Sequence, residues 1–406
     1  MKTKSSIPSI YGARSWRNSF NPIRSLSPES LTRCLDAFHG GELRPAAVLW
    51  ESIERRDDVL QAAATKRKKS VSRLQWDILT TDGGEMAQRQ REALNFFYNS
   101  LSCVSAVDGN ERGGFSLLVR QMMDAVGKKY AVHEIVYRQH GRCSCRGTGK
   151  ALISAEFRFV PLEFFENSSG KLRFLAKDGD RDGAALEDGS WLTTVGDGLM
   201  EACSIAYLFK HLPMRDWLVY CERNGMPGVK CTTDAIPGSS QWDEARSAVE
   251  SFGAEFHALL APGSDLQAID LGARGELPYP GLVERMDRAM AALWCGSDLS
   301  TLSRASAVGA SLQSDGMAVL ESEDAAMISE TLNAQVDSYV LGHLFGDEPA
   351  LAYVRIRPRT QVETIRELEI CERLSKLGLP LSENDLRERF AIGLACGGAV
   401  GGRPKC

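Results

Sequence analysis

One acidic segment of the sequence has the residue types of a cation-binding loop. Asp178, Asp180 and Asp182 place carboxylates at alternate positions, and Gly183 follows them. An EF-hand calcium loop begins in this way, but it needs a bidentate Glu at its twelfth position. That position is Gly189 here, and the flanking residues have the alternation of strands. The segment therefore predicts a solvated β-turn, and a metal-dependent nucleic-acid enzyme that uses these carboxylates is the alternative.

A cysteine pair and a glycine-rich segment follow one another in a second candidate loop. His140, Cys143 and Cys145 supply at most three closely spaced ligands, whereas a structural zinc site takes four. The Gly-Thr-Gly-Lys segment at residues 147–150 lacks the earlier Gly and the following Ser or Thr of a Walker loop. We expect no ATP site here, and the sequence leaves open whether Cys143 and Cys145 bind a metal.

The six histidines are isolated from one another in the sequence. His133 lies on a predicted strand and His343 on the apolar stripe of a predicted helix, so both are interpreted as core or boundary residues. No Gly-x-Ser-x-Gly segment and no pair of metal-binding histidines occurs. Because a catalytic base is recognised by its partners, we predict no catalytic residue, no cofactor and no enzyme activity.

A run of four basic residues, Lys66, Arg67, Lys68 and Lys69, ends a predicted helix. Such runs usually lie in solvent and complement the helix dipole, and contact with nucleic acid or another subunit is the functional alternative. The first 80 residues contain 14 basic and 8 acidic residues, a net charge of +6, and the remainder carries −11. The whole chain carries −5, so attraction of the entire protein to nucleic acid is not available. The two parts could instead form complementary subunit faces.

Length and composition are those of an ordinary folded protein. The 406 residues are 43% hydrophobic and 25% charged, which predicts two or three domains. No segment approaches the roughly 20 apolar residues of a membrane span, and the N-terminus lacks the apolar run of a signal peptide. The eleven cysteines are scattered and odd in number, so we interpret them as small buried hydrophobes in a reducing compartment. We expect no membrane association.

Hydrophobic periodicity predicts an α+β fold that would position these groups. Helices are expected at residues 45–72, 86–101, 115–125, 199–223, 242–260, 282–294, 317–345 and, as a terminal pair, within 358–392. Strands are expected at residues 74–79, 131–137, 151–160, 172–176 and 352–356. A Ser-, Gly- and Ala-rich connector spans residues 296–314.

Three segments of the chain carry a family resemblance. They are the Asn-Pro-Ile-Arg-Ser-Leu-Ser-Pro sequence at residues 21–28, the strand ending Leu-Gln-Trp-Asp-Ile at residue 78, and a stretch with Asp216, Trp217, Glu222, Gly225 and Pro227. The third matches an Asp-Trp-x-x-Phe-x-Glu-x-x-Gly-x-Pro signature, with Tyr220 in place of Phe. In these segments, and also at residues 133–137, 321–345 and 377–382, the chain resembles the Mu-like phage portal protein family, so the resemblance covers residues 21–392. The loop at residues 294–301 departs from that family's usual sequence.

The resemblance implies a portal fold with a wing, a helical stem, a small α/β clip and a helical crown. The implied parts are an N-terminal arm (1–24), the wing (25–195), stem helix 1 (196–227), the clip (228–274), stem helix 2 (275–296), a candidate tunnel loop (297–316), a long wing helix with a strand (317–357), the crown (358–392) and a flexible tail (393–406). Periodicity alone also gives a helix, a strand-rich insert and a second helix over residues 199–294.

The resemblance also implies a function. Portal subunits form a ring, typically of twelve copies, at one vertex of a phage or prophage capsid, and double-stranded DNA passes through it during packaging and ejection. The implied partners are further copies of the chain, DNA in transit, the terminase large subunit, the major capsid or scaffold protein and the head-tail connector. The implied locations are the virion and, during assembly, the bacterial host cytoplasm.

Two groups of residues are candidates for contacts within such a ring. Arg304 in the connector is the candidate for a side chain facing DNA, and the basic run at residues 66–69 is the candidate for DNA or assembly contact. A prophage remnant that no longer assembles and serves as an interaction scaffold remains a further alternative.

Overall fold

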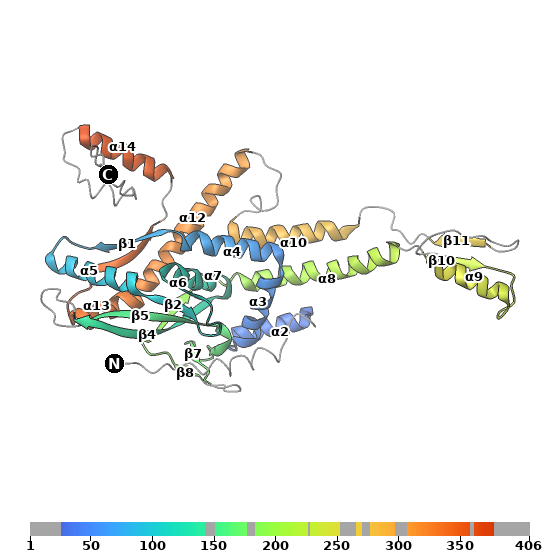
Figure 1. The fold of residues 1–406 in the computed structure, drawn as a ribbon, viewed down its shortest axis with the longest axis horizontal. Coiled ribbons are helices and arrows are strands. Elements are labelled where there is room, and N and C mark those ends of the chain that lie inside the picture. The colour runs from blue at the N-terminus through green and yellow to red at the C-terminus, as the bar shows by residue number, and fades with distance from the viewer. Residues whose placement is uncertain are drawn as a thin grey trace, which may run out of the picture.

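The computed structural model describes residues 26–142, 151–176, 183–225, 228–251, 265–269, 277–296, 307–357 and 361–376. Figure 1 shows helices packed around a sheet at one end of the molecule and a long helical pair that projects away from them. Helices and antiparallel strands are interspersed along the chain, so the predicted α+β class is confirmed.

A five-stranded sheet forms the centre of the larger part. Its order is β3-β2-β5-β4-β9, with β3 at Arg112–Gly113, β2 at Ser102–Ser105, β5 at Ala151–Val160, β4 at Tyr130–Arg142 and β9 at Trp191–Val195. Only the β2–β5 pair is parallel. Because side chains alternate between the faces of a strand, the Ile135 and Phe157 pair enters the main core while the Val132 and Val160 pair enters a second core.

Helices from the first third of the chain cover the sheet. These are α2 (Pro28–His39), α3 (Arg44–Arg56), α4 (Asp58–Ser72), α5 (Glu85–Ser100), α6 (Phe115–Met122) and α7 (Asp124–Lys128). The single helix predicted over residues 45–72 is wrong, because the chain is extended at Asp57 between α3 and α4. The Asp57 carboxylate accepts a hydrogen bond of 2.9 Å from the Leu60 N–H. It therefore caps α4, and a cap requires non-helical backbone at that position.

A long helical segment from the last third of the chain completes the main core. It consists of α12 (Ala307–Leu332), the π-helical turn η2 (Asn333–Asp337) and α13 (Ser338–Phe345). After it, β12 (Ala352–Arg357) pairs antiparallel with β1 (Gln75–Thr80). The connector predicted to reach residue 314 is wrong in its second half, because α12 begins at Ala307. Alanine is the strongest helix former, so a segment of small residues need not be a loop.

Two helices leave the larger part side by side (Figure 1). They are α8 (Met200–Gly225) and α10 (Pro278–Cys295), and between them lie β10 (Gly228–Thr232), α9 (Ser240–Ser251) and β11 (Asp265–Ile269). Strands β10 and β11 pair antiparallel. Of the helix predicted at residues 242–260, the part after Ser251 lies outside the described residues.

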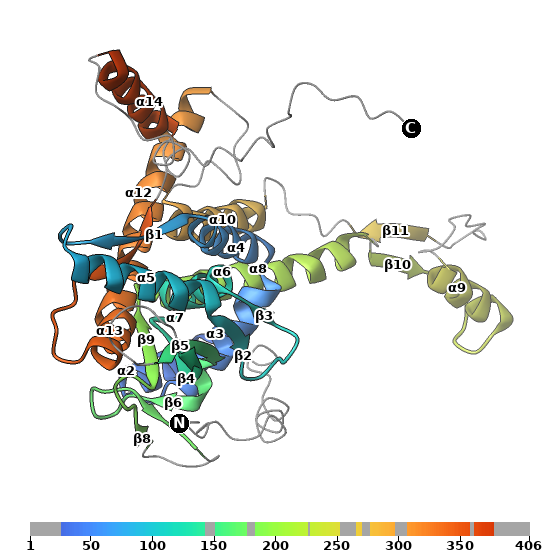
Figure 2. The ribbon, with the colours of Figure 1, turned by 60° about the vertical axis from the view of Figure 1, so that its left-hand side comes forward.

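We call the elements from α2 to β9, together with α12 to β12, the body. We call α8 beyond Pro213, the β10–α9–β11 tip and α10 before Asp287 the arm. This arm is a different part of the chain from the predicted N-terminal arm at residues 1–24. The remaining short elements are η1 (Leu162–Phe164), β6 (Phe165–Glu166), β7 (Arg173–Phe174), β8 (Ala184–Ala185) and α14 (Gln361–Lys376). Figure 2 shows α14 outside the body, near the end of α12, while the β10–α9–β11 tip lies at the far end of α8.

Candidate functional site

The helix α8 presents an unusually apolar surface where it leaves the body. Phe209 is 51% exposed, Leu218 is 62% exposed and Val219 is 41% exposed. Helix α10 packs along one side of α8, and these side chains remain exposed beside it. Exposed apolar side chains gathered on one element mark a protein contact. The exposed surface of α8 is therefore the candidate assembly surface.

The signature residues lie in the outer half of α8. Asp216 is largely exposed, with its carboxylate 3.6 Å from Arg215, and Trp217 is half-buried. Glu222 and Gly225 fall in the last turns of the helix, and Pro227 lies outside the described residues. The signature thus lies along the outer half of the first arm helix and reaches its last residue, Gly225.

The basic run at residues 66–69 divides into two inward-facing and two outward-facing side chains. The Arg67 side chain is 4% exposed and donates two hydrogen bonds to Asp324, at 2.7 and 2.9 Å. The Lys68 ammonium group lies 2.5 Å from Glu54 and 2.8 Å from Asp124. Arg67 and Lys68 are therefore already paired within the subunit, which disfavours the predicted contact of either with DNA or another subunit. Lys66 and Lys69 are exposed and stay candidates.

Arg67 joins three parts of the chain that are distant in sequence. It extends from α4 to Asp324 on α12, and its guanidinium lies 3.5 Å from the Trp294 carbonyl oxygen near the end of α10. Asp197, before α8, lies 3.7 Å away. A guanidinium group has a planar array of donors that suits a carboxylate bound through both oxygens. Arg67 therefore fixes α12 and the base of α10 against α4.

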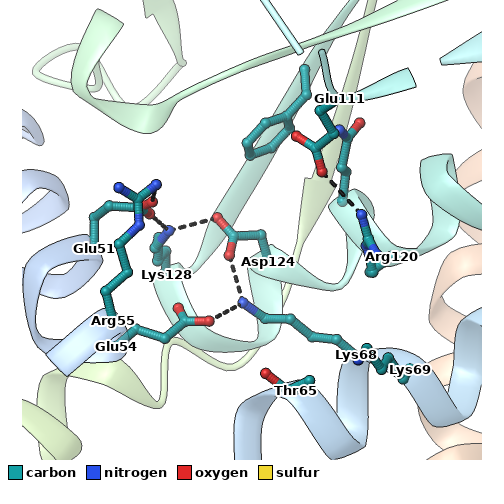
Figure 3. A pocket seen from close by; sticks show the side chains of 12 residues that line it. Glu51, Glu54, Arg55, Thr65, Lys68, Lys69, Glu111, Arg120, Asp124 and Lys128 are labelled. Atoms are coloured by element: carbon teal, nitrogen blue, oxygen red, sulfur yellow. Dashed lines mark hydrogen bonds and ion pairs between the residues drawn. The ribbon is translucent and has the colours of Figure 1, made fainter. Parts of the chain in front are cut away.

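Lys68 belongs to a chain of ion pairs beside a cavity of about 330 Å³ (Figure 3). Its second partner, Asp124, also lies 2.9 Å from Lys128, which in turn contacts Glu51. Burial would raise the pKa of Asp124, but Lys128 and Lys68 together lower it. Burial would lower the pKa of Lys128, but Asp124 and Glu51 raise it. Asp124 and Lys128 are therefore charged at neutral pH, and Lys68 and Lys128 already have carboxylate partners within the protein.

A second buried ionic cluster lies where α8 leaves the body. The Lys210 ammonium group is 2.9 Å from Asp57, 2.6 Å from Asp287 and 3.2 Å from Asp58. Burial would raise the pKa of Asp57, but hydrogen bonds from His211, the Leu60 N–H and Lys210 lower it to about 2. The sequence analysis did not single out this cluster. The available signal was the Asp57-Asp58 pair in the middle of a predicted helix, where Asp is a poor helix former and a good cap.

The residues considered for catalysis or metal binding do not assemble into a site within the described ranges. His133 is fully buried, burial lowers its pKa to about 3, and its Nε2 lies 3.2 Å from Gln121 Oε1. Its interpretation as a core residue is confirmed. The described residues contain no group of three His, Cys, Asp or Glu side chains arranged to hold a metal ion. Asp178 to Asp182, Cys143, Cys145 and Arg304 lie outside the described residues.

A comparison with known protein families identifies the family of this chain. The family described as "Portal protein of Mu bacteriophage" matches residues 47–392. The chain belongs to this family of phage portal proteins. The match begins within α3 and extends beyond α14, so the arm and all of the body of this portal protein except α2 and the start of α3 lie within it. The family is structural, and the protein is a component of the phage head. No curated protein matches the sequence of this portal subunit.

Solved structures share the fold of this portal subunit at low sequence identity. A chain in the neck of the native gene transfer agent particle, computed with C12 symmetry, is 10% identical, with a TM-score of 0.51 over 95% of this chain and 99% of that chain. A chain in the neck of the empty particle, computed with C6 symmetry, is 11% identical, with a TM-score of 0.50 over 84% and 93%. An HK97 family phage portal protein from Corynebacterium diphtheriae is 12% identical, with a TM-score of 0.41 over 76% and 95%. None of the described helices is long and apolar enough to cross a membrane.

Proposed function

We propose that copies of this portal subunit form a ring at one vertex of a phage capsid, and that double-stranded DNA is packaged and ejected through the ring. The observation that carries the proposal is the apolar surface of α8, where the neighbouring Leu218 and Val219 are exposed on the part of the helix that projects from the body. A second copy of the chain would cover this surface. Family membership supports the same assignment.

Ring closure is the form of assembly that suits a projecting helical pair. A head-to-tail contact between unlike surfaces repeats until it closes, which gives cyclic symmetry. The neck of the native gene transfer agent particle, which contains a chain of similar fold, was computed with C12 symmetry. We therefore propose a ring of about twelve subunits in which each α8–α10 pair packs against the next.

The charge of the subunit suits transit of DNA better than retention. Each phosphate that a Lys or Arg side chain neutralises adds a salt-dependent contribution to binding. The chain carries −5, and the buried Arg67 and Lys68 are committed to carboxylates within the subunit. The segment that joins α10 to α12 and contains Arg304 stays the candidate tunnel loop. Its contribution is tested by measuring the rate of DNA packaging with an Arg304→Ala subunit. Packaging at the wild-type rate would refute the prediction that Arg304 contacts DNA in the channel.

The partners follow from the same proposal. Residues 147–150 do not form a Walker loop, so a separate terminase motor would supply the free energy of packaging. The β10–α9–β11 tip is the end of the arm farthest from the body, and it is the candidate surface for the terminase and the head-tail connector. The remaining partner is the major capsid or scaffold protein. The subunit would assemble in the bacterial host cytoplasm before it enters the virion.

Native mass together with negative-stain images tests the ring directly. The wild type is expected to give a particle with a central hole and a mass near a twelvefold multiple of 44.5 kDa. Leu218→Glu places a charge in the proposed contact and is expected to shift the population to monomers. Val195→Glu is the matched control, because Val195 is 50% exposed at the end of β9 in the body. A Leu218→Glu protein that assembles as the wild type does would refute the α8 contact.

A further inference from the structure

The Lys210 cluster lies at the boundary between body and arm. Leu208 and Lys210 are buried, but none of the residues from 211 to 221 is. On α10, which runs back along α8, the first buried residue is Met290. Asp287, the partner of Lys210 on α10, therefore lies three residues before the point at which α10 becomes buried in the body. The cluster joins α8, α10 and the α3–α4 junction at the level where the arm begins.

The charges of this cluster are unbalanced without Lys210. The carboxylates of Asp57, Asp58 and Asp287 lie within 3.2 Å of one ammonium group, although the Asp58 side chain is 90% exposed. The other basic side chain beside Asp57 is His211, whose Nε2 lies 3.5 Å away. The Asp57 side chain is completely buried and cannot be solvated in place of its partner. Burial and the neighbouring Asp57 and Asp58 carboxylates raise the pKa of Asp287 even with Lys210 present. Without Lys210, the body-side and arm-side carboxylates would therefore repel one another.

The weakest point of α8 follows directly after this cluster. Pro213 lies inside the helix, and a proline has no N–H to donate to the carbonyl four residues earlier. The Phe209 carbonyl thus lacks its helical donor at the position where the helix loses contact with the body. Interior prolines are among the common sites of helix bending. Bending of α8 at this position would tilt the arm while leaving the body unchanged.

The angle of the arm has a direct consequence for ring closure. If both the arm and the body contact the neighbouring copy, the same rotation between neighbouring subunits must satisfy both contacts. Successive subunits are rotated by about 30° in a ring of twelve and by about 28° in a ring of thirteen. A tilt of a few degrees between arm and body therefore suffices to change the number of subunits that close the ring.

We propose that Lys210 is a positioning residue that fixes the angle at which the arm leaves the body, immediately before the Pro213 bend point, and thereby fixes the number of subunits in the ring. The second half of this inference rests on the proposed function, whereas the first half concerns a single chain. The Lys210 side chain is only 5% exposed on the single subunit. It acts through the orientation of α8 and α10.

Distances between the arm and the body test the first half. Spin labels introduced as non-natural amino acids at position 92 on α5 and position 221 on α8 report the arm angle, because both sites are exposed. Position 221 lies eight residues beyond Pro213, or about 12 Å along the helix. A tilt of about 20° would move it by about 4 Å. An excess of unlabelled full-length chains restricts the signal to distances within one subunit.

Lys210→Met is expected to shift or broaden the distance distribution by about 4 Å. Arg288→Met is the matched control, since Arg288 lies beside Asp287 on α10 but forms an exposed pair with Glu284, and it should retain the wild-type distribution. Pro213→Ala restores the missing helical donor, so Lys210→Met combined with Pro213→Ala should give a narrower distribution than Lys210→Met alone. An unchanged distribution in Lys210→Met, or a double variant as broad as the single one, would overturn the proposal.

Native mass of the same variants tests the second half. The wild type is expected to give one subunit number and Lys210→Met a mixture of at least two. If the distances change but the subunit number does not, the link between arm angle and ring closure is overturned. If the wild type forms no ring at all, the proposed portal assembly fails, while the distance measurement still decides whether Lys210 positions the arm.

Discussion

Loss of Arg67 should destabilise the body far more than its place in a basic run would indicate. The perturbation is Arg67→Met, which keeps the length of the side chain and removes the guanidinium. Asp324 would then remain on α12 with its side chain 5% exposed and both hydrogen bonds from Arg67 removed. An unpaired buried charge of this kind costs about 3–5 kcal/mol of unfolding free energy.

A double substitution distinguishes this cost from a simple loss of packing. Removing both partners, as in Arg67→Met with Asp324→Leu, leaves no unpaired charge, and such replacements are often neutral or stabilising. We expect the double variant to lie within about 1 kcal/mol of the wild type, so it should be about 2–4 kcal/mol more stable than Arg67→Met alone. Leucine is also a better helix former than Asp.

The assay is urea unfolding followed by tryptophan fluorescence, at a protein concentration where the oligomeric state is the same for all variants. Trp294 reports on the relevant region, because it is fully buried and its carbonyl oxygen lies 3.5 Å from Arg67. Arg89→Met is the control, since Arg89 pairs with Glu85 on the surface of α5, and it should change stability by no more than about 1 kcal/mol. A loss below about 1 kcal/mol for Arg67→Met, or a double variant no more stable than the single one, would refute the reasoning.

Three further predictions concern pH, backbone conformation and the exposed lysines. Burial raises the pKa of Asp337 to about 7, although Tyr98 and the Val354 N–H donate to its carboxylate. The folded state therefore keeps this proton at pH values where the unfolded chain has lost it. The protonated carboxyl contributes about 4 kcal/mol to the free energy of unfolding; this contribution is complete below about pH 4 and is lost as pH rises through 7. Asp337→Asn should remove this pH dependence in urea unfolding measured from pH 4 to 8. Gly41→Ala should cost more than about 2 kcal/mol by the same assay, because φ is +94° and a Cβ atom would lie 2.4 Å from a backbone nitrogen. Gly170→Ala, where φ is +77° and space is open, should cost about 1–2 kcal/mol. Glutamate at Lys66 and Lys69 should change stability by less than about 0.5 kcal/mol, so a defect in native mass or packaging would identify an assembly or DNA contact, whereas wild-type behaviour would show that both lie on a solvated face.

Local sequence predicted most of the secondary structure because helix and strand periods are properties of short segments. The arm is an example, since residues 199–223 and 282–294 were predicted as helices and the structure has α8 and α10 there. The secondary-structure prediction was wrong where a single residue ended a helix although the hydrophobic pattern continued. Asp57 ends α3 and caps α4, and that cap was present in the sequence as a side chain suited to it.

The candidate sites were harder to predict because the sequence does not state whether a charged side chain will be exposed, buried or paired. Lys66, Arg67, Lys68 and Lys69 look alike as a run, yet two are exposed and two are held by carboxylates. Helical geometry turns successive residues by about 100°, which puts adjacent lysines on different faces. Arg67 is buried against α10 and α12, which come much later in the chain, whereas Lys68 pairs with carboxylates on α3 and α7.

The sequence by itself determined the family, the helical arm and the absence of a Walker loop, because motifs and periods are written in consecutive residues. Only the tertiary structure decided which charges are paired. Arg67 and Asp324 are 257 residues apart, and Lys210 and Asp57 are 153 residues apart. The strength of an ion pair depends on distance and on exclusion of water, and both quantities exist only after the chain has folded.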